Sequence, residues 1–303
     1  MIQKFDSLFD LLKAFPTELS AIKHFEAIRW KHGAYCPHCG SVKVYHFSDQ
    51  KTHKCGDCRK RFSIKVGTIF EDSKVPLQKW FMAIWLITSH KKGIASTQLA
   101  KDISVTQKTA WFMLHRLRCA AKTKSFNRPL DGTIEADETY VGGKSKNMHQ
   151  KDRDAGKQHS NKSIVVGLKQ RDGDLRAEIV ADRGMSGIQK VVTDNVATGS
   201  ILITDENHAY KALGRLYSHE TVRHAGGEYV RGAIHTNSIE SVWALLKRQI
   251  IGIHHFVSAK HLQRYLDEMM FRQNRRDVGE GNRVNMLLAA TDGKRLRYKE
   301  LIA

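Results

Sequence analysis

The amino-acid sequence predicts a multidomain chain of α+β and α/β units, in which small N-terminal units precede a larger α/β domain. Three observations support this fold class. Four cysteines form two close pairs within residues 31–72, helical periodicity follows in residues 73–126, and β-rich stretches alternate with helical ones after residue 130. A chain of 303 residues is long enough for two or three domains of ordinary size.

Composition limits the classes of function. Hydrophobic residues make up 41% of the chain, which is enough for a packed core and argues against wholesale disorder. The formal net charge of +19 favours polyanionic partners, nucleic acid first and an anionic membrane surface second. A soluble protein with a merely basic surface is the simpler alternative.

Membrane insertion and secretion are not expected. The sequence has no run of about 18 apolar residues, so no helix should span a membrane. The first residues include Asp6 and Asp10 and lack a small-residue cleavage site, so they do not resemble a secretory signal. Cysteine pairs in such a chain indicate metal binding rather than disulfides, and we expect a cytoplasmic location.

The cysteines form two CxxC motifs, Cys36-Pro-His-Cys39 and Cys55-Gly-Asp-Cys58, and the intervening residues can form a hairpin. Two residues between thiolates let both sulfurs reach one tetrahedral ion, and four thiolates close its coordination shell. The pattern therefore predicts a zinc ribbon with structural Zn²⁺. Redox-active CxxC motifs are less favoured, because neither pair begins a helix after a strand.

The ribbon is basic, and basic side chains can contact DNA phosphates. The residues expected to do so are Arg59, Lys60 and Arg61. Solubility alone is the alternative explanation of this charge.

Residues 96–122 read as two helices around a tight turn, with Ser96 and Thr106 as N-caps. This pattern predicts a helix-turn-helix whose second helix would dock in the DNA major groove. Its outward-facing candidates for DNA contact are Gln107, Lys108 and Arg118. A plain helical hairpin is the alternative.

The C-terminal half follows the order β-β-β-α-β-α-β-α, with a hairpin turn signal at Arg171–Asp174 and a long helix from Asn237. The predicted units are N-terminal helices (1–30), a zinc ribbon (31–72), DNA-binding helices (73–126), an α/β catalytic domain (130–275) and a C-terminal tail (276–303).

Three carboxylates occupy informative places in this order. Asp137 lies in the middle of the first strand, Asp205 closes the strand SILITD, and Glu240 lies in the first turn of the last helix. Lys247 follows seven residues later on the same helix face. Three such carboxylates can hold two Mg²⁺ ions for phosphoryl displacement, since hard cations prefer oxygen ligands.

Each carboxylate also has a simpler explanation. Asp137 can be an exposed strand residue, and Asp205 can begin a turn or cap the next helix. Glu240 can complete a capping box with Asn237, because N-x-x-E matches that pattern. The three positions taken together favour the catalytic interpretation.

Several phrases resemble the zinc-ribbon insertion-sequence DDE transposases, bacterial relatives of the Merlin elements. These phrases are CPHCG…KCGDCRKRFSIKVGTIFEDSK, ADETYVGGK, ITDENHAY and HTNSIESVWALLKRQIIGIHHF. The resemblance extends over about residues 20–275. It implies a ribonuclease H-like catalytic domain with Asp137, Asp205 and Glu240 as its acids, Lys247 as its basic residue, and Mg²⁺ or Mn²⁺ as cofactor.

The same resemblance implies binding to terminal inverted repeats and target DNA as a homodimer or higher oligomer. Cleavage at the element ends would be followed by attack of a 3′-hydroxyl on target DNA. Some members of the family use asparagine in the third acidic position, so Asn237 is an alternative to Glu240. Asn207 stands near the place where an aromatic residue often follows the second acid.

Two rival functions remain open. One is a DNA-binding regulator with a zinc ribbon, a helix-turn-helix and an inactive ribonuclease H-like domain. The other is a nuclease of the same fold that cuts DNA without strand transfer. The complete set of acids argues against the first, and a strand-transfer assay distinguishes the second.

Overall fold

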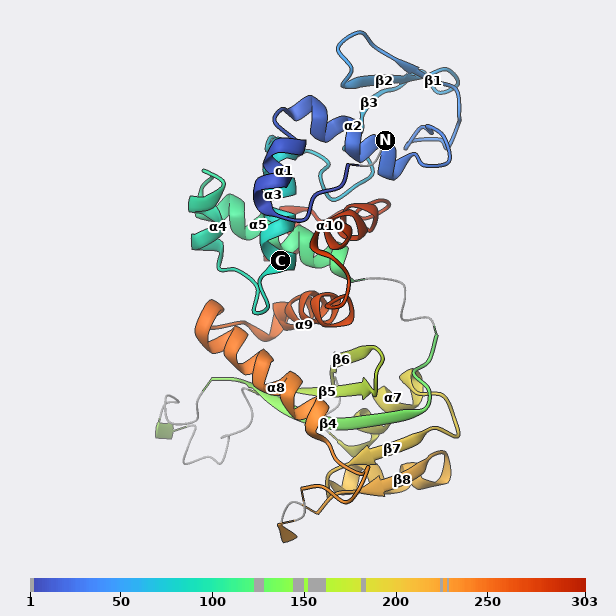
Figure 1. The fold of residues 1–303 in the computed structure, drawn as a ribbon, viewed down its shortest axis with the longest axis vertical. Coiled ribbons are helices and arrows are strands. Elements are labelled where there is room, and N and C mark those ends of the chain that lie inside the picture. Colours follow the sequence, from blue (N-terminus) through green and yellow to red (C-terminus); the bar gives the residue numbers. More distant parts are fainter. Residues whose placement is uncertain are drawn as a thin grey trace. The chain divides into compact units, whose positions relative to one another are not determined.

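A computed structural model describes residues 3–122, 128–143, 150–151, 162–180, 184–223, 226–227 and 229–303. The chain forms two compact units (Figure 1). The first contains residues 1–123 together with 275–303, and the second contains residues 124–274. The N-terminal and C-terminal parts of the chain therefore build one unit, and the segment between them builds the other.

The first unit begins with two capped helices and a small sheet. Helix α1 (Leu8–Ala14) is capped by Ser7, and α2 (Glu18–Arg29) begins with a capping box. The sheet is antiparallel in the order β1-β2-β3. Its strands are β1 (Val44–His46), β2 (Thr52–Cys55) and β3 (Arg61–Ser63).

Three helices follow the small sheet: α3 (Leu77–Ser89), α4 (Ser96–Asp102) and α5 (Gln107–Ala121). The hydroxyl of Thr106 accepts a hydrogen bond from the Thr109 amide, so the predicted cap of α5 is confirmed. The predicted cap of α4 is wrong by one residue, because Ala95 holds the N-cap position. Ser96, as the first helical residue, instead accepts a hydrogen bond from Gln107.

Residues 276–303, expected as a tail, contain α10 (Glu280–Ala289) and α11 (Tyr298–Ile302) in the first unit. Helix α10 buries Val284, Leu287 and Leu288, an apolar stripe at helical spacing. The Nε2 atom of His24 on α2 lies 2.8 Å from Oδ1 of Asn285. The C-terminal residues are thus part of the core of the first unit.

The second unit is built on a five-stranded sheet in the order β6-β5-β4-β7-β8. Strands β6, β5 and β4 are antiparallel neighbours, whereas β7 runs parallel to both β4 and β8. The strands are β4 (Thr133–Gly142), β5 (Lys162–Gln170), β6 (Leu175–Ile179), β7 (Ile201–Thr204) and β8 (Ser218–Thr221).

Helices cover both faces of this sheet (Figure 1). One face packs against α7 (Met185–Asn195) and the 3-10 helix η3 (His208–Arg215). The other packs against α8 (Asn237–Gln249) and α9 (Ala259–Asn274), which the π-helical segment η5 (Ile250–His254) joins. The order of elements and the sheet topology are those of a ribonuclease H-like fold, as the sequence predicted.

Strand β4 divides its side chains between the two layers. Ile134 and Ala136 lie in the core with α7 and η3, whereas Val141 lies in the core with α8 and α9. Side chains alternate along a strand, so Glu135 and Asp137 share the face of Val141. The first predicted acid therefore faces the layer of α8, the helix that carries Glu240.

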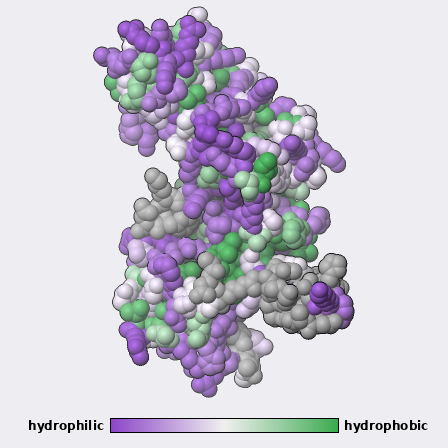
Figure 2. All heavy atoms as spheres, turned by 180° about the vertical axis from the view of Figure 1, so that it is seen from behind, coloured by the Kyte–Doolittle hydropathy of each residue, from purple (hydrophilic) through white to green (hydrophobic). Residues whose placement is uncertain are grey.

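The surface of the first unit is polar around the small sheet. On the face shown in Figure 2, hydrophilic residues cover most of this part of the chain. Among the described residues, no helix combines the length and apolar character that crossing a membrane requires.

Candidate active site

Asp137 and Asp205 meet where β4 extends beyond its partner β7. Residue pairing between these parallel strands ends at Glu135↔Ile203, and the same register places Asp137 beside Asp205, the first residue after β7. One carboxylate oxygen each from Asp137, Glu138 and Asp205 lies within 4.8 Å of the others. Two predicted acids thus converge at the carboxyl end of a parallel strand, where α/β sheets place ligands.

The side chain of Asp137 is fixed from two sides. Its Oδ2 accepts a 3.0 Å hydrogen bond from the indole Nε1 of Trp243 on α8. Its Oδ1 accepts a 2.8 Å bond from the Glu138 amide. These contacts orient the carboxylate, a requirement for precise metal coordination.

Trp243 can reach Asp137 because the neighbouring strand carries a glycine. Gly167 on β5 pairs with Asp137, and a Cβ at Gly167 would lie 2.6 Å from Cη2 of Trp243. The same Cβ would lie 2.7 Å from Cδ1 of Ile239. This arrangement could not be predicted from the sequence, since only the strand register sets Gly167 opposite Asp137.

Burial raises the pKa of two of these carboxyl groups, Asp137 and Glu138. Burial, followed by the charges of Glu138 and Asp205, raises the pKa of Asp137 to about 7. Burial also raises the pKa of Glu138, although hydrogen bonds from Tyr210 and Asn207 oppose the shift. A divalent cation would relieve this repulsion, and its preferred ligands are carboxylate oxygens. The residues present therefore fit a divalent cation.

Glu138 links the middle of β4 to the segment after β7. Its carboxylate accepts hydrogen bonds from Nδ2 of Asn207 and, at 2.9 Å, from the hydroxyl of Tyr210. The Asn207 amide in turn donates to Oδ1 of Asp205 at 3.0 Å. Glu138 was not among the predicted site residues, although its place beside Asp137 in the sequence was a usable signal. The turn suggested for Asp205 is present and coexists with its place in the acidic group.

Glu240 lies outside the 4.8 Å group of carboxylates. It is exposed in the first turn of α8, one helical turn before Trp243, and its Oε1 accepts a 2.9 Å bond from the Thr236 hydroxyl. Thr236 holds the N-cap position of α8, so the alternative in which Asn237 caps this helix is wrong. Lys247 is exposed in the last turn of α8.

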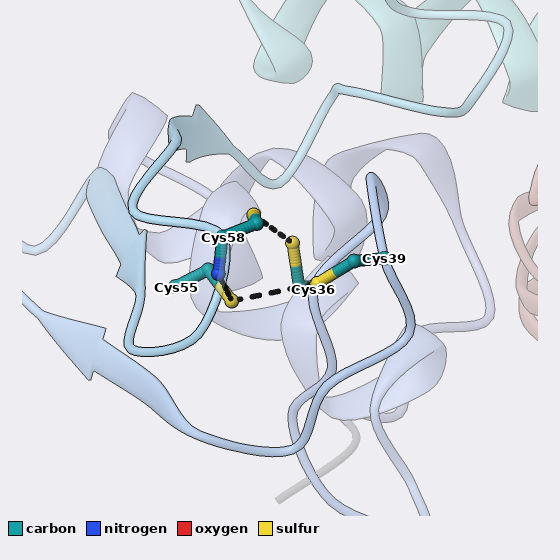
Figure 3. A group of neighbouring side chains, drawn as sticks. All are labelled: Cys36, Cys39, Cys55 and Cys58. Atoms are coloured by element: carbon teal, nitrogen blue, oxygen red, sulfur yellow. Dashed lines mark hydrogen bonds between the residues drawn. The ribbon is translucent and has the colours of Figure 1, made fainter.

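The four paired cysteines form the predicted metal centre. Their sulfur atoms turn toward one another between the two CxxC turns (Figure 3). Sγ of Cys36 lies 3.7 Å from that of Cys58, and Sγ of Cys39 lies 3.6 Å from that of Cys55. Tetrahedral zinc with bonds of about 2.3 Å requires sulfurs about 3.8 Å apart. The spacing therefore fits one Zn²⁺.

Five of the six predicted DNA-contacting residues are exposed. Arg59, Lys60 and Arg61 are exposed on the ribbon, and Gln107 and Lys108 are exposed in the first turn of α5. Arg118 is only 1% exposed, so its expected outward orientation is wrong. It lies on the face of α5 that also buries Leu114 and Leu117, which explains its burial.

Comparisons with known proteins match both the zinc-ribbon region and the α/β domain. Residues 129–274 match the ISXO2-like transposase domain, and residues 16–61 match a transposase zinc-ribbon domain. A protein of Halobacterium salinarum (strain ATCC 700922 / JCM 11081 / NRC-1), described as an uncharacterized protein in transposable element ISH50, is 31% identical over 284 residues. The match covers 86% of this chain and 92% of that protein. The chain belongs to the ISXO2-like transposase family.

Two solved structures resemble the transposase more distantly. A chain of the simian T-cell lymphotropic virus intasome in complex with PP2A regulatory subunit B56 gamma is 14% identical, with a TM-score of 0.28. The match covers 57% of the transposase and 63% of that chain. A chain of a pre-cleavage Mos1 transpososome is 12% identical with a TM-score of 0.24, and 72% and 80% of the two chains are covered. The fold assignment does not depend on likenesses this weak.

Proposed function

We propose that this transposase cleaves DNA at the ends of its mobile element and joins those ends to target DNA. The reaction would be phosphodiester hydrolysis followed by transesterification, with Asp137, Asp205 and Glu240 as catalytic acids. The observation that carries the proposal is the convergence of Asp137 and Asp205 at the carboxyl end of β7 within the ribonuclease H-like sheet.

Asp137 and Asp205 would hold divalent cations, and Glu138 adds a third carboxylate to their group. Glu240, exposed on the helix that contacts Asp137 through Trp243, would complete the coordination when DNA and metal are bound. Bound there, Mg²⁺ or Mn²⁺ would stabilise the attacking and leaving oxygens of a phosphoryl displacement. Lys247, in the last turn of the same helix, would bind a DNA phosphate.

The first unit would bind the DNA that the second unit cuts. Arg59, Lys60 and Arg61 offer positive charge to phosphates, and Gln107 and Lys108 stand where a recognition helix reads base edges. We further propose that the working form is a homodimer or higher oligomer assembled on the terminal inverted repeats. Two element ends must be processed together for such a reaction, which favours more than one active site.

The test is cleavage of element-end DNA by full-length variants with added Mg²⁺. Asp137→Asn, Asp205→Asn and Glu240→Gln should each abolish cleavage while DNA binding persists. Asp194→Asn is a matched control, because this exposed carboxylate on α7 pairs only locally with Lys190. Full cleavage by any of the three variants would remove that residue from the mechanism.

A strand-transfer assay separates the proposal from its rivals. Joining of pre-cleaved ends to target DNA is expected for a transposase. Cleavage without joining would indicate a nuclease of the same fold, and metal-independent binding without either reaction would indicate a regulator.

A further inference from the structure

Glu135 is a completely buried carboxylate two residues before Asp137 on the same face of β4. Burial of such a group is costly unless several hydrogen bonds satisfy it. Its donors come from two places distant in sequence, the hairpin turn after β5 and the start of α8. Glu135 belongs neither to the proposed catalytic set nor to the proposed DNA contacts.

The carboxylate of Glu135 caps α8 from outside the helix. Its Oε2 accepts hydrogen bonds from the amides of Ser238 at 2.8 Å and Ile239 at 3.1 Å. These are the second and third residues of α8, whose amides an N-cap side chain ordinarily satisfies. Thr236, the residue at the N-cap position, makes no such side-chain bond. A residue of the sheet therefore takes the place of the local cap.

The other oxygen of Glu135 joins the same helix start to the β5–β6 hairpin. Its Oε1 accepts bonds from the Ser238 hydroxyl and from Nε of Arg171, each at 3.1 Å. Arg171 also donates from its Nη2 to the carbonyl of His235 at 3.2 Å. The start of α8 is thus held both to β4 and to the hairpin.

Helix α8 is consequently attached to β4 at two points. Glu135 binds the amides of Ser238 and Ile239, and Asp137 accepts the indole hydrogen bond of Trp243. The two residue steps from Glu135 to Asp137 along the strand span about 6.8 Å, and the five residue steps from Ser238 to Trp243 along the helix rise about 7.5 Å. The two spacings match, so both contacts form together. Glu240 lies between the two attachment points.

We propose that Glu135 is a positioning residue that fixes the start of α8 on β4 and thereby sets the place of Glu240 relative to Asp137. The role in catalysis depends on the proposed function, but the attachment itself does not. Glutamine in place of Glu135 would turn an NH₂ group toward hydrogen-bond donors. Helix α8 would then be released at its start while the sheet keeps its core.

The first measurement is the Trp243 indole ¹H–¹⁵N resonance in the full-length protein. Trp243 is the only tryptophan within residues 124–274, and Trp243→Phe assigns its resonance. Glu135→Gln should shift or broaden this resonance. Ser238→Ala removes the hydroxyl contact to Glu135 and keeps the backbone amide contact, so it should give a smaller change in the same direction. This variant serves if Glu135→Gln does not fold.

The control is Glu268→Gln. Glu268 is also a buried glutamate paired with an arginine, Arg272, but both lie on α9. The Glu268→Gln variant tests whether loss of any buried charge pair changes the Trp243 resonance as Glu135→Gln does. The Trp243 resonance should keep its position in this variant.

The second measurement is Mg²⁺-dependent cleavage of element-end DNA. Misplacing Glu240 should lower kcat of Glu135→Gln at least about tenfold and leave KM for DNA within about twofold. An unmoved Trp243 resonance, or an equal loss of kcat in Glu268→Gln, would overturn the proposal. If the wild-type protein cleaves no DNA, the proposed function fails, and the resonance alone decides whether Glu135 holds α8.

Discussion

The indole of Trp243 donates a 3.0 Å hydrogen bond to the carboxylate of Asp137 and so joins α8 directly to the central strand of the sheet. The bond fixes one of the two carboxylate oxygens, and the Glu138 amide donates to the other. Gly167 provides the space in which the ring lies. The orientation of the Asp137 carboxylate thus depends on a glycine of the neighbouring strand.

Gly167→Ala should therefore damage the site through Trp243. The added methyl group would overlap the indole ring, and overpacking of this kind costs about 1–3 kcal/mol of unfolding free energy. We expect lower stability in urea unfolding and loss of most DNA cleavage. Gly252→Ala is the control, because a Cβ at Gly252 meets nothing within 4 Å. If Gly167→Ala is as stable and as active as the wild-type protein, the Trp243 ring can move without harm to the site.

Without added Mg²⁺ or Mn²⁺, stability should fall as the pH rises toward 7. The pKa of Asp137 is about 7 in the folded protein and 3.8 ordinarily, so between these values the folded state holds a proton that the unfolded state lacks. Each pH unit in that window should then remove up to about 1.4 kcal/mol of unfolding free energy. Urea unfolding from pH 5 to 8 measures the slope.

Asp137→Asn supplies the comparison for this pH dependence, since its amide does not titrate. The variant should lose less stability than wild type over the same range, and parallel profiles would contradict the assignment. Mg²⁺ should stabilise wild type more at pH 8 than at pH 6, because protons compete with the cation for the carboxylate.

Zinc analysis tests the cysteine centre. Purified protein should contain about one zinc per chain, bound by thiolates. Cys55→Ser removes a completely buried ligand and should lower both the zinc content and the unfolding temperature. Cys119→Ser should keep the zinc, because Cys119 lies on α5 outside the cysteine group. A protein that stays folded after losing zinc would contradict a structural role.

Salt dependence tests the proposed DNA contacts of the ribbon. Arg59→Ala and Arg61→Ala should each weaken DNA binding and reduce the slope of log affinity against log salt by about 1. Lys190→Ala, which removes an exposed lysine of α7, is the control for charge alone. If the slope of log affinity against log salt is unchanged in both arginine variants, Arg59 and Arg61 do not contact the DNA.

Asp292→Ala tests whether the C-terminal residues stabilise the first unit. Asp292 accepts hydrogen bonds from Arg29 at 3.0 Å and from the hydroxyl of Tyr35. Loss of the carboxylate would leave the buried Arg29 guanidinium with fewer partners and should cost about 1–3 kcal/mol of unfolding free energy. Asp277→Ala, at a side chain 90% exposed, should be neutral in the same urea unfolding experiment.

Much of the fold could be predicted from local patterns. The CxxC spacing predicted the zinc ribbon, and the β-β-β-α-β-α-β-α order predicted the sheet and its covering helices. The C-terminal helices were missed, although Val284, Leu287 and Leu288 have helical spacing. The apolar stripe of α10 is short, and it packs against α2 and α3, which are far away in the sequence. Its place in the fold therefore could not be predicted from local patterns.

The site could be predicted only in part for a similar reason. Asp137 and Asp205 were identified because their strand positions are visible in the sequence. Glu135, Gly167 and Trp243 act through strand register and helix packing, which no local pattern reveals. The exposure of Arg118 was predicted wrongly. Helical periodicity shows which residues of α5 share a face, but it does not show which faces other elements cover. The catalytic roles of Asp137, Asp205, Glu240 and Lys247 all stay predictions.

The division of the chain has a consequence for its synthesis on the ribosome. Residues 275–303 complete the first unit, yet they are translated after the whole second unit. The ribbon and its supporting helices therefore emerge early but lack Asp292 and α10 until translation nears residue 303. Nascent chains should thus complete the unit that carries the transposase domain before the unit that carries the zinc ribbon, so the transposase domain can fold while the ribbon still lacks part of its support.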